Sequence, residues 1–121
     1  MPMLASLRAS FQELRMGFCR TVMNPHRRVR TIDGLIDPIA LSALAQLAAS
    51  MVIEVSLPAG LQWATRGITI EYLQDTRDQT MALARLDRID WSQAGPVGVP
   101  VTISDRLGTE VARAVVSFVV S

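Results

Sequence analysis

The chain has 121 residues, a formal net charge of +1 and a hydrophobic content of 50%. This length fits one domain with a substantial core, and the hydrophobic content excludes a disordered chain. The balanced charge and the lack of a recognisable basic binding motif argue against nucleic acid as a partner. We therefore expect a single domain over residues 1–121.

Every basic residue of the chain is an arginine, and the arginines are unevenly distributed. Residues 1–32 contain only one acidic residue, Glu13, so positive charge is concentrated there. Arg27, Arg28 and Arg30 form a local cluster within this segment. The cluster is compatible with a solvated basic surface and with contact to a phosphorylated ligand.

Cys19 is the only cysteine, so it cannot form an internal disulfide. Its strand-like neighbours favour a position in the core over a nucleophilic role. The single histidine, His26, stands beside Pro25, and the pattern supplies no further ligands for a metal site. We expect no metal, no secretory signal segment and a cytoplasmic location.

The first third of the chain predicts short elements. Residues 4–13 have a loosely helical spacing of apolar side chains, and residues 16–23 predict a strand that ends at Asn24-Pro25. A second extended segment is predicted over residues 29–32, before a turn at Asp33-Gly34.

One long apolar stretch, residues 37–55, predicts a central helix. Asp37 is suited to cap its first turn, and Pro38 suits the first helical position. Four polar residues recur at every fourth position of the stretch: Ser42, Gln46, Ser50 and Glu54. They form one slowly winding stripe, so the helix is expected to be covered by protein on most sides. The stripe also argues against a membrane span.

After this helix the apolar pattern changes to a two-residue period, which is typical of strands. The predicted strands are residues 67–73, 79–89, 99–104 and 110–120. Residues 95–98 predict a loose connection or a bulge, and residues 105–108 predict the turn of a hairpin. The pattern indicates an α+β fold with an antiparallel sheet of about five to six strands wrapped around one long central helix. Because one sheet cannot cover the helix on all sides, we expect a second subunit.

Several stretches, taken in their order and spacing, resemble the hotdog-fold thioesterase superfamily, in the branch of phenylacetate-pathway-type acyl-CoA thioesterases. They are FQELRMG at 11–17, DGLIDPIA at the helix start, EVSLPAG after the helix, RGITIEYL at 66–73 and VTISDRLGTEVARAVVSFVV near the C-terminus. The resemblance implies a six-stranded hotdog domain that forms a homodimer or homotetramer. It also implies an acyl-CoA site between subunits, with coenzyme A as part of the substrate and no separate cofactor.

Superfamily members with established chemistry carry an asparagine, a glycine, a histidine-glycine pair at the helix start and, later in the helix, an acidic residue. In this chain the corresponding residues are Thr31, Gly34, Asp37 and Gln46. Only Gly34 is retained. The residue after Asp37 is Pro38, which has no amide hydrogen to donate to a thioester carbonyl.

The resemblance implies site roles for six residues. The catalytic candidates are Asp37 and Gln46, and the substrate-binding candidates are Gly34, Ile39, Arg66 and Gly67. Asp37 is predicted either as a helix cap or as the catalytic base. Gln46 is predicted either to orient water or to be a buried polar residue satisfied by a partner helix.

Further residues carry open alternatives. Arg66 is expected to pair with a phosphate of coenzyme A or with Glu71, and Gly67 to allow close backbone approach. Glu54 and Glu71 are alternative catalytic carboxylates. The two tryptophans, Trp63 and Trp91, are expected to be packing or interface residues.

Two functions follow from the pattern and the resemblance together. One is an acyl-CoA thioesterase, in which water attacks the acyl carbon and the thiolate leaves. The other is a non-catalytic hotdog protein that binds an acyl-CoA-like ligand or acts as an assembly subunit. The absence of the superfamily's histidine, glycine and acidic residue favours the second function. The overall pattern of helix and strands, which is retained, favours neither function.

Overall fold

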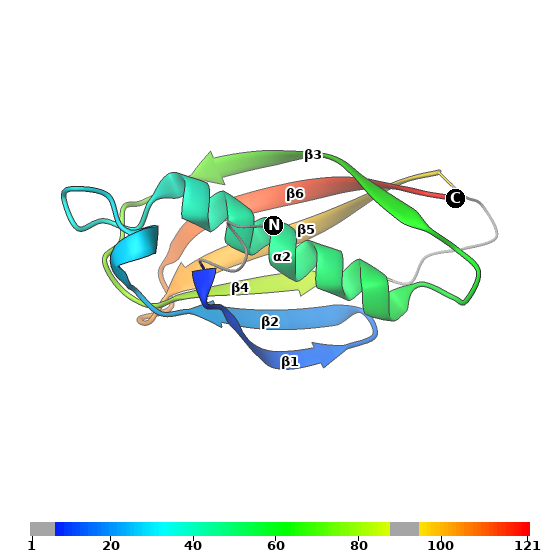
Figure 1. Ribbon diagram of the computed structural model, residues 1–121, viewed down its shortest axis with the longest axis horizontal. Coiled ribbons are helices and arrows are strands. Elements are labelled where there is room, and N and C mark those ends of the chain that lie inside the picture. Colours follow the sequence, from blue (N-terminus) through cyan, green and yellow to red (C-terminus); the bar gives the residue numbers. More distant parts are fainter. Residues whose placement is uncertain (1–6, 88–94) are drawn as a thin grey trace.

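The fold is a single curved sheet around one long helix. A computed structural model describes residues 7–87 and 95–121. Within them, a six-stranded antiparallel sheet has the strand order β1-β2-β4-β5-β6-β3 (Figure 1). The strands are β1 (Ser10–Arg15), β2 (Phe18–Met23), β3 (Trp63–Tyr72), β4 (Thr80–Arg85), β5 (Gly95–Asp105) and β6 (Glu110–Val120). The named helices are the short 3-10 helix η1 (Arg27–Val29) and the long helix α2 (Pro38–Ser56).

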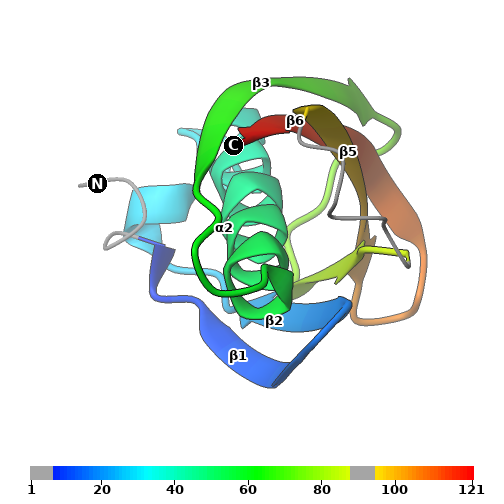
Figure 2. The same cartoon turned by 90° about the vertical axis from the view of Figure 1, so that its right-hand side faces the viewer.

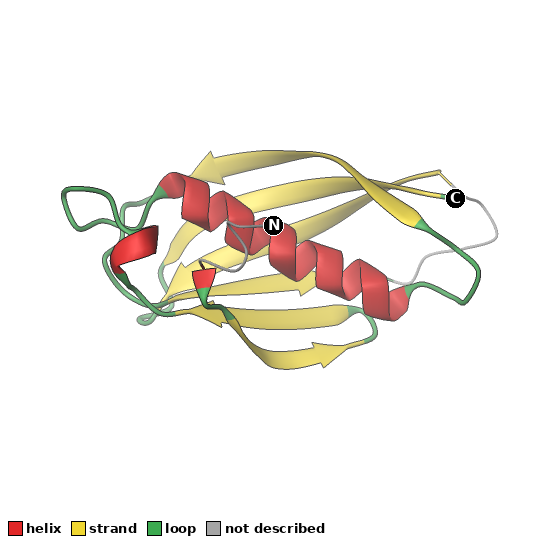
Figure 3. Cartoon of the chain, in the orientation of Figure 1, coloured by secondary structure: helices red, strands yellow, loops and turns green. Residues whose placement is uncertain are grey.

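Figure 2 looks nearly along α2 and shows the sheet curving around it, with helix and strands forming two layers (Figure 3). The predicted α+β hotdog architecture is therefore confirmed. Two strands precede the helix and four follow it, as the sequence indicates.

The helix α2 begins and ends close to where its sequence predicts. The carboxylate of Asp37 accepts a hydrogen bond from the amide of Ile39, at 2.9 Å, and Pro38 occupies the first helical position. At the other end the Leu57 amide donates to the Ile53 carbonyl, at 3.0 Å, and the chain then becomes extended. The predicted range of residues 37–55 is thus confirmed to within one residue.

The apolar composition of α2 is explained by its position in the core. By length and composition this helix could cross a membrane, yet 56% of its apolar window is buried inside the protein. Its buried residues are Ala40, Leu41, Ala43, Leu44, Ala45, Ala48, Ala49, Val52, Ile53 and Ser56. The predicted polar stripe lies on the more exposed side, where Glu54 is exposed and Ser42, Gln46 and Ser50 are partly buried.

The two faces of the sheet differ because side chains alternate along each strand. On the face toward α2, Val99, Val101 and Ile103 of β5 are buried, and so is the small residue pair Ala82 and Ala84 of β4. These alanines leave room for the helix backbone to approach the sheet. The opposite face, which we call the outer face, carries the alternate residues of each strand.

The predicted helix over residues 4–13 is wrong from Ser10 onward, where β1 begins, and residues 4–6 lie outside the described residues. This segment pairs antiparallel with β2, and Gly17, at φ +81°, makes the turn between them. The conformation of this segment is determined by hydrogen bonds to β2. The helical spacing of its apolar residues therefore does not predict it.

Several other boundaries also differ from the prediction. The strand predicted over residues 67–73 begins four residues earlier, at Trp63, and ends at Tyr72. Residues 29–32 are not a strand, because η1 ends at Val29 and only an isolated bridge between Arg30 and Ile36 follows. The strand predicted over residues 79–89 ends at Arg85, and residue 89 lies outside the described residues. Residues 95–98 are neither a loose connection nor a bulge but the first part of β5, paired in regular register with the end of β6.

The core predicts a measurable loss of stability on truncation of Phe118. This side chain is fully buried, and its ring stands at 85° to the Trp63 ring in a T-shaped contact with centroids 5.5 Å apart. The packing expectation for Trp63 is confirmed, whereas Trp91 lies outside the described residues. We expect Phe118→Ala to lower the free energy of unfolding by about 3–5 kcal/mol in urea titration. Phe118→Leu removes fewer atoms and should cost about 1–2 kcal/mol; equal losses for both variants would contradict this packing.

Candidate functional site

The loop before α2 is held in place by hydrogen bonds from a backbone amide and from an arginine side chain to backbone carbonyls. The amide of Ile36 donates to the carbonyl of Thr76, at 2.8 Å, and Arg77 donates to the carbonyl of Asp33, at 2.7 Å. Gly34 has φ +81°, and a Cβ added to it would lie 2.7 Å from Nη1 of Arg77. The glycine is therefore required by the shape of this loop. Its predicted contact with substrate remains a prediction.

The start of α2 brings three chemically different groups together. The carboxylate of Asp37 caps the helix through the amide of Ile39. The hydroxyl of Tyr72, at the end of β3, donates to the carbonyl of Pro38, at 3.0 Å. Ile39 is 63% exposed and Tyr72 is 46% exposed, so both side chains are accessible. A carboxylate, a phenolic hydroxyl and an apolar side chain thus surround the helix start.

Gln46 lies farther along the same helix, on its partly exposed side. It follows Asp37 by nine residues, which corresponds to about 13 Å along the helix axis. The structure therefore does not bring the two catalytic candidates together within one subunit. A site that used both residues would need the second subunit.

Arg66 and Gly67 lie on β3, an edge strand of the sheet. The register between β3 and β6 shifts between Thr65 and Gly67, so Arg66 is the extra residue of a bulge. Arg66 is exposed, and no atom lies within 4 Å of a Cβ added to Gly67. Gly67 is about 17 Å from Tyr72 along the strand. These candidates are therefore remote from Asp37 within one subunit.

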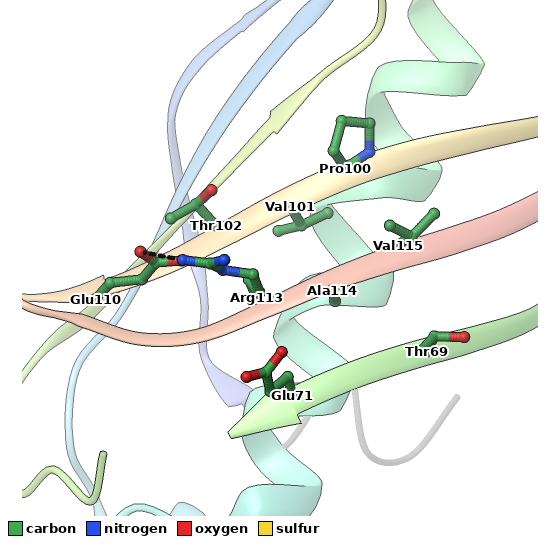
Figure 4. Close-up of a pocket in the computed structure, with 9 residues that line it drawn as sticks. All are labelled: Thr69, Glu71, Pro100, Val101, Thr102, Glu110, Arg113, Ala114 and Val115. Atoms are coloured by element: carbon green, nitrogen blue, oxygen red, sulfur yellow. Dashed lines mark hydrogen bonds and ion pairs between the residues drawn. The ribbon is translucent and has the colours of Figure 1, made fainter. Parts of the chain in front are cut away.

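The two alternative carboxylates do not reach the start of α2 within one subunit. Glu71 belongs to the outer face, where it lies near Arg113 and away from the helix (Figure 4). Glu54 lies near the end of α2, where it accepts a hydrogen bond from Nε1 of Trp63, at 2.6 Å. The hypothesis that either acid reaches a site between subunits stays a prediction.

The basic cluster of the N-terminal segment lies beside the helix start. Arg27, Arg28 and Arg30 are exposed on and after η1, and the Val29 carbonyl accepts a hydrogen bond from the Asp37 amide, at 2.7 Å. The cluster therefore borders the candidate site. His26, just before it, contacts the carbonyl of a buried residue through Nε2, at 3.0 Å, and so has a structural position.

Cys19 is confirmed as a core residue. Its side chain is fully buried, and its sulfur lies 3.2 Å from the hydroxyl oxygen of Thr21. Burial raises the pKa of the Cys19 thiol, although the contact with Thr21 acts in the opposite direction. The thiol is therefore protonated near neutral pH and is a poor nucleophile.

A groove of about 480 Å³ lies on the outer face, away from the start of α2. Figure 4 shows it between β3, β6 and β5, with an ion pair along one side. Its lining residues include Thr69, Pro100 and Val115, and Arg113 bonds Glu110 there at 2.8 Å. That hydrogen bond lowers the pKa of Glu110. The groove holds none of the six predicted site residues.

Tyr72 is the functional candidate that the sequence did not single out. Its side chain points to the same side as Ile68 and Ile70, so the two-residue period could have placed it on the helix side of β3. The period alone could not show that this side chain meets the start of α2. Among residues 7–87 and 95–121, no group of three metal-ligating side chains is found.

Comparisons with known proteins agree with the fold. The model of the domain of unknown function DUF4442 matches residues 1–120. No curated protein of similar sequence was found. A crystal structure described only as a genomics target shares 36% sequence identity and superposes with a TM-score of 0.93, covering 99% of this chain and 81% of that one.

More distant structures share the fold at low identity. A thioesterase from Haemophilus influenzae is 14% identical, with a TM-score of 0.87 over 98% of this chain and 81% of its own. A protein of unknown function from Pseudomonas aeruginosa, described as a probable thioesterase, is 17% identical, with a TM-score of 0.89 over 99% of this chain and 87% of its own. At these identities the likeness establishes the hotdog fold, not the activity.

The cap at the start of α2 can be tested by its stability. We expect Asp37→Ala to lower the free energy of unfolding by about 0.5–2 kcal/mol, because the Ile39 amide loses its partner. Asp37→Asn should retain most of the stability, since asparagine caps helices equally well. Urea titration of both variants measures the difference. Equal destabilisation by alanine and asparagine would argue against the cap.

The buried thiol makes a second prediction. We expect Cys19 in the folded protein to react with an aromatic disulfide reagent at pH 8 much more slowly than in urea, because both burial and its raised pKa suppress the thiolate. The absorbance of the released thiol measures both rates. Similar rates in the two states would show that the thiol is accessible.

Proposed function

The chain belongs to the DUF4442 family, and we propose that it is an acyl-CoA thioesterase whose site lies at the start of α2, between two subunits. One observation carries this proposal: at the helix start, beside the edge strand β3, the Asp37 carboxylate accepts from the Ile39 amide and the Tyr72 hydroxyl donates to the Pro38 carbonyl. The hotdog thioesterases among the structural neighbours support the reaction class by analogy.

The second subunit would supply the residues that one chain keeps remote. Beyond the bulge at Arg66, the regular part of β3 runs from Gly67 to Tyr72. An edge strand can pair with its own copy in antiparallel orientation. If this part pairs with itself about Ile70, Ile68 of the partner subunit comes opposite Tyr72, because opposed residues face the same side of the sheet. Gly67 of the partner subunit would then follow one residue further along the paired strand.

The proposed chemistry assigns a role to each group. Asp37 takes a proton from water, and the water oxygen attacks the acyl carbon of the thioester. The C–S bond then breaks, and coenzyme A leaves as the thiolate, which is protonated from solvent. To donate to the carbonyl oxygen of the substrate, the Tyr72 hydroxyl must leave the Pro38 carbonyl and the Ile39 amide must leave Asp37. Gln46 of the partner subunit orients water.

The exposed groups around the site suit the rest of an acyl-CoA. The side chain of Ile39 offers an apolar contact for the acyl group. Arg27, Arg28 and Arg30 border the helix start, where they can pair with the phosphates of coenzyme A. Arg66 of the partner subunit is the other candidate for these phosphates. No resident cofactor is required.

A second function is favoured by a specific observation. Pro38 has no amide hydrogen, and the Ile39 amide is already engaged by Asp37. The helix start therefore lacks a free pair of donors for a developing oxyanion. A hotdog protein that binds an acyl-CoA-like ligand without hydrolysis would need neither donor nor base.

Thiol release from short-chain, aryl and long-chain acyl-CoA esters tests the reaction. We expect turnover of at least one ester by the wild-type chain. Asp37→Asn should lower kcat by about 10²-fold or more, because it retains the cap but removes the base. Ser50→Ala, on the same side of α2 but remote from its start, should leave kcat unchanged.

Several outcomes would decide between the two functions. If calorimetry shows that an acyl-CoA ester binds and no thiol is released, the non-catalytic alternative is established. Full activity in Asp37→Asn would remove Asp37 from the mechanism.

The subunit arrangement makes an independent prediction. Light scattering should give the mass of a homodimer or a homotetramer, because the proposed site is incomplete in one chain. A monomeric enzyme that turns over an acyl-CoA would contradict the shared site.

A further inference from the structure

Three arginines surround one aromatic ring on the outer face of the sheet. The guanidinium carbons of Arg15, Arg20 and Arg85 lie 4.6, 5.5 and 5.7 Å from the centre of the Phe18 ring. Three adjacent strands contribute them, since Phe18 pairs with Arg15 on one side and with Arg85 on the other. We call these three arginines the Phe18 cluster.

The Phe18 cluster carries more positive than negative charge. Its carboxylate among the described residues is Glu13, which lies 2.8 Å from Nε of Arg15 and 3.8 Å from Nη1 of Arg20. Two of the three guanidinium groups therefore share one carboxylate, and Arg85 has no ion pair among the described residues. Neighbouring like charges on a sheet destabilise each other, so an additional anion would relieve this repulsion.

One of the cluster's donors is already removed from water. Nε of Arg20 is buried, and it has no hydrogen-bond partner within the part of the chain that the structure describes. A buried donor without a partner is costly, and such groups often indicate a missing ligand or water. The side chain as a whole is 38% exposed, so its other nitrogens remain accessible to an anion.

A second groove adjoins the cluster. It has a volume of about 330 Å³ and is lined by Arg85, Leu83, Pro100 and Thr102. The guanidinium of Arg85 thus belongs both to the Phe18 cluster and to the wall of a groove, together with a threonine hydroxyl. The Phe18 ring is only 6% exposed, so it supports the arginines but offers no stacking surface to a ligand.

We propose that the Phe18 cluster binds a phosphate-bearing anion on the outer face of the sheet, at a site separate from the start of α2. Arginine side chains form charge-assisted, often paired hydrogen bonds with phosphate oxygens, and here the ring holds three of them in position. The phosphate can belong to an inorganic anion or to a nucleotide such as coenzyme A. This site does not depend on the thioesterase reaction.

Calorimetric titration of the full chain with inorganic pyrophosphate at low ionic strength tests the site. We expect binding that weakens as salt is added, because the contacts are ionic. In Arg85→Gln and in Arg15→Gln, the Kd should rise about tenfold or more, the effect of one charged hydrogen bond. Arg106→Gln, in the exposed turn between β5 and β6, is the matched control and should bind like the wild type.

Nitrogen-15 spectra of the arginine Nε–H groups locate the anion. We expect pyrophosphate to shift the signals of Arg15, Arg20 and Arg85 and to leave that of Arg106 unchanged. A parallel titration with coenzyme A identifies the source of the phosphate: shifts of the same signals support a nucleotide ligand, and shifts with pyrophosphate alone support an inorganic one. No binding of either anion, or equal binding by all variants, would overturn the proposal. Circular dichroism of each variant confirms that it is folded.

Discussion

The structure depends on burying one almost entirely apolar helix. In α2 ten residues are buried, nine of them apolar, and leaving these nine together in water would carry a large cost in free energy. A flat sheet would cover only one side of such a helix, whereas the curved six-stranded sheet contacts it from strands along its whole width (Figure 2). The buried residues Leu7 and Val29, which lie outside the sheet, join the same core. The sheet is therefore curved because it must cover the apolar surface of the helix on several sides.

That constraint also explains why the two ends of α2 are chemically important. The middle of the helix is enclosed, so polar groups are confined to its ends and to one stripe. At the start, Asp37 both satisfies a backbone amide and presents a carboxylate at the surface. At the end, Glu54 bonds Trp63 and so ties the helix to the first residue of β3. One end is therefore a candidate for chemistry, and the other end is a structural joint.

The sequence predicted those parts of the fold that local patterns determine. Patterns within a few neighbouring residues determine three of these features: the helix cap at Asp37, the hairpin around residues 105–108 and the alternation of Ile68 and Ile70. The errors concern Ser10–Arg15 and residues 95–98, whose conformation depends on pairing with β2 and β6. The same limit applies to the site. The family resemblance indicated Asp37 as a site residue. Only the three-dimensional fold shows that Tyr72 contacts the same helix start and that the Phe18 cluster lies on the outer face.

The small residues between α2 and β4 have a consequence for how this chain can vary. Ala82 and Ala84 are fully buried beneath a helix that itself presents several alanines, so there is little spare volume at this contact. A larger side chain there would lift the helix and move Asp37 away from Tyr72. Divergence among related chains should therefore be slow along this alanine contact and fast on the outer face. Under the proposed function, a substitution at the exposed Ile39 alters the acyl contact without disturbing the core beneath it.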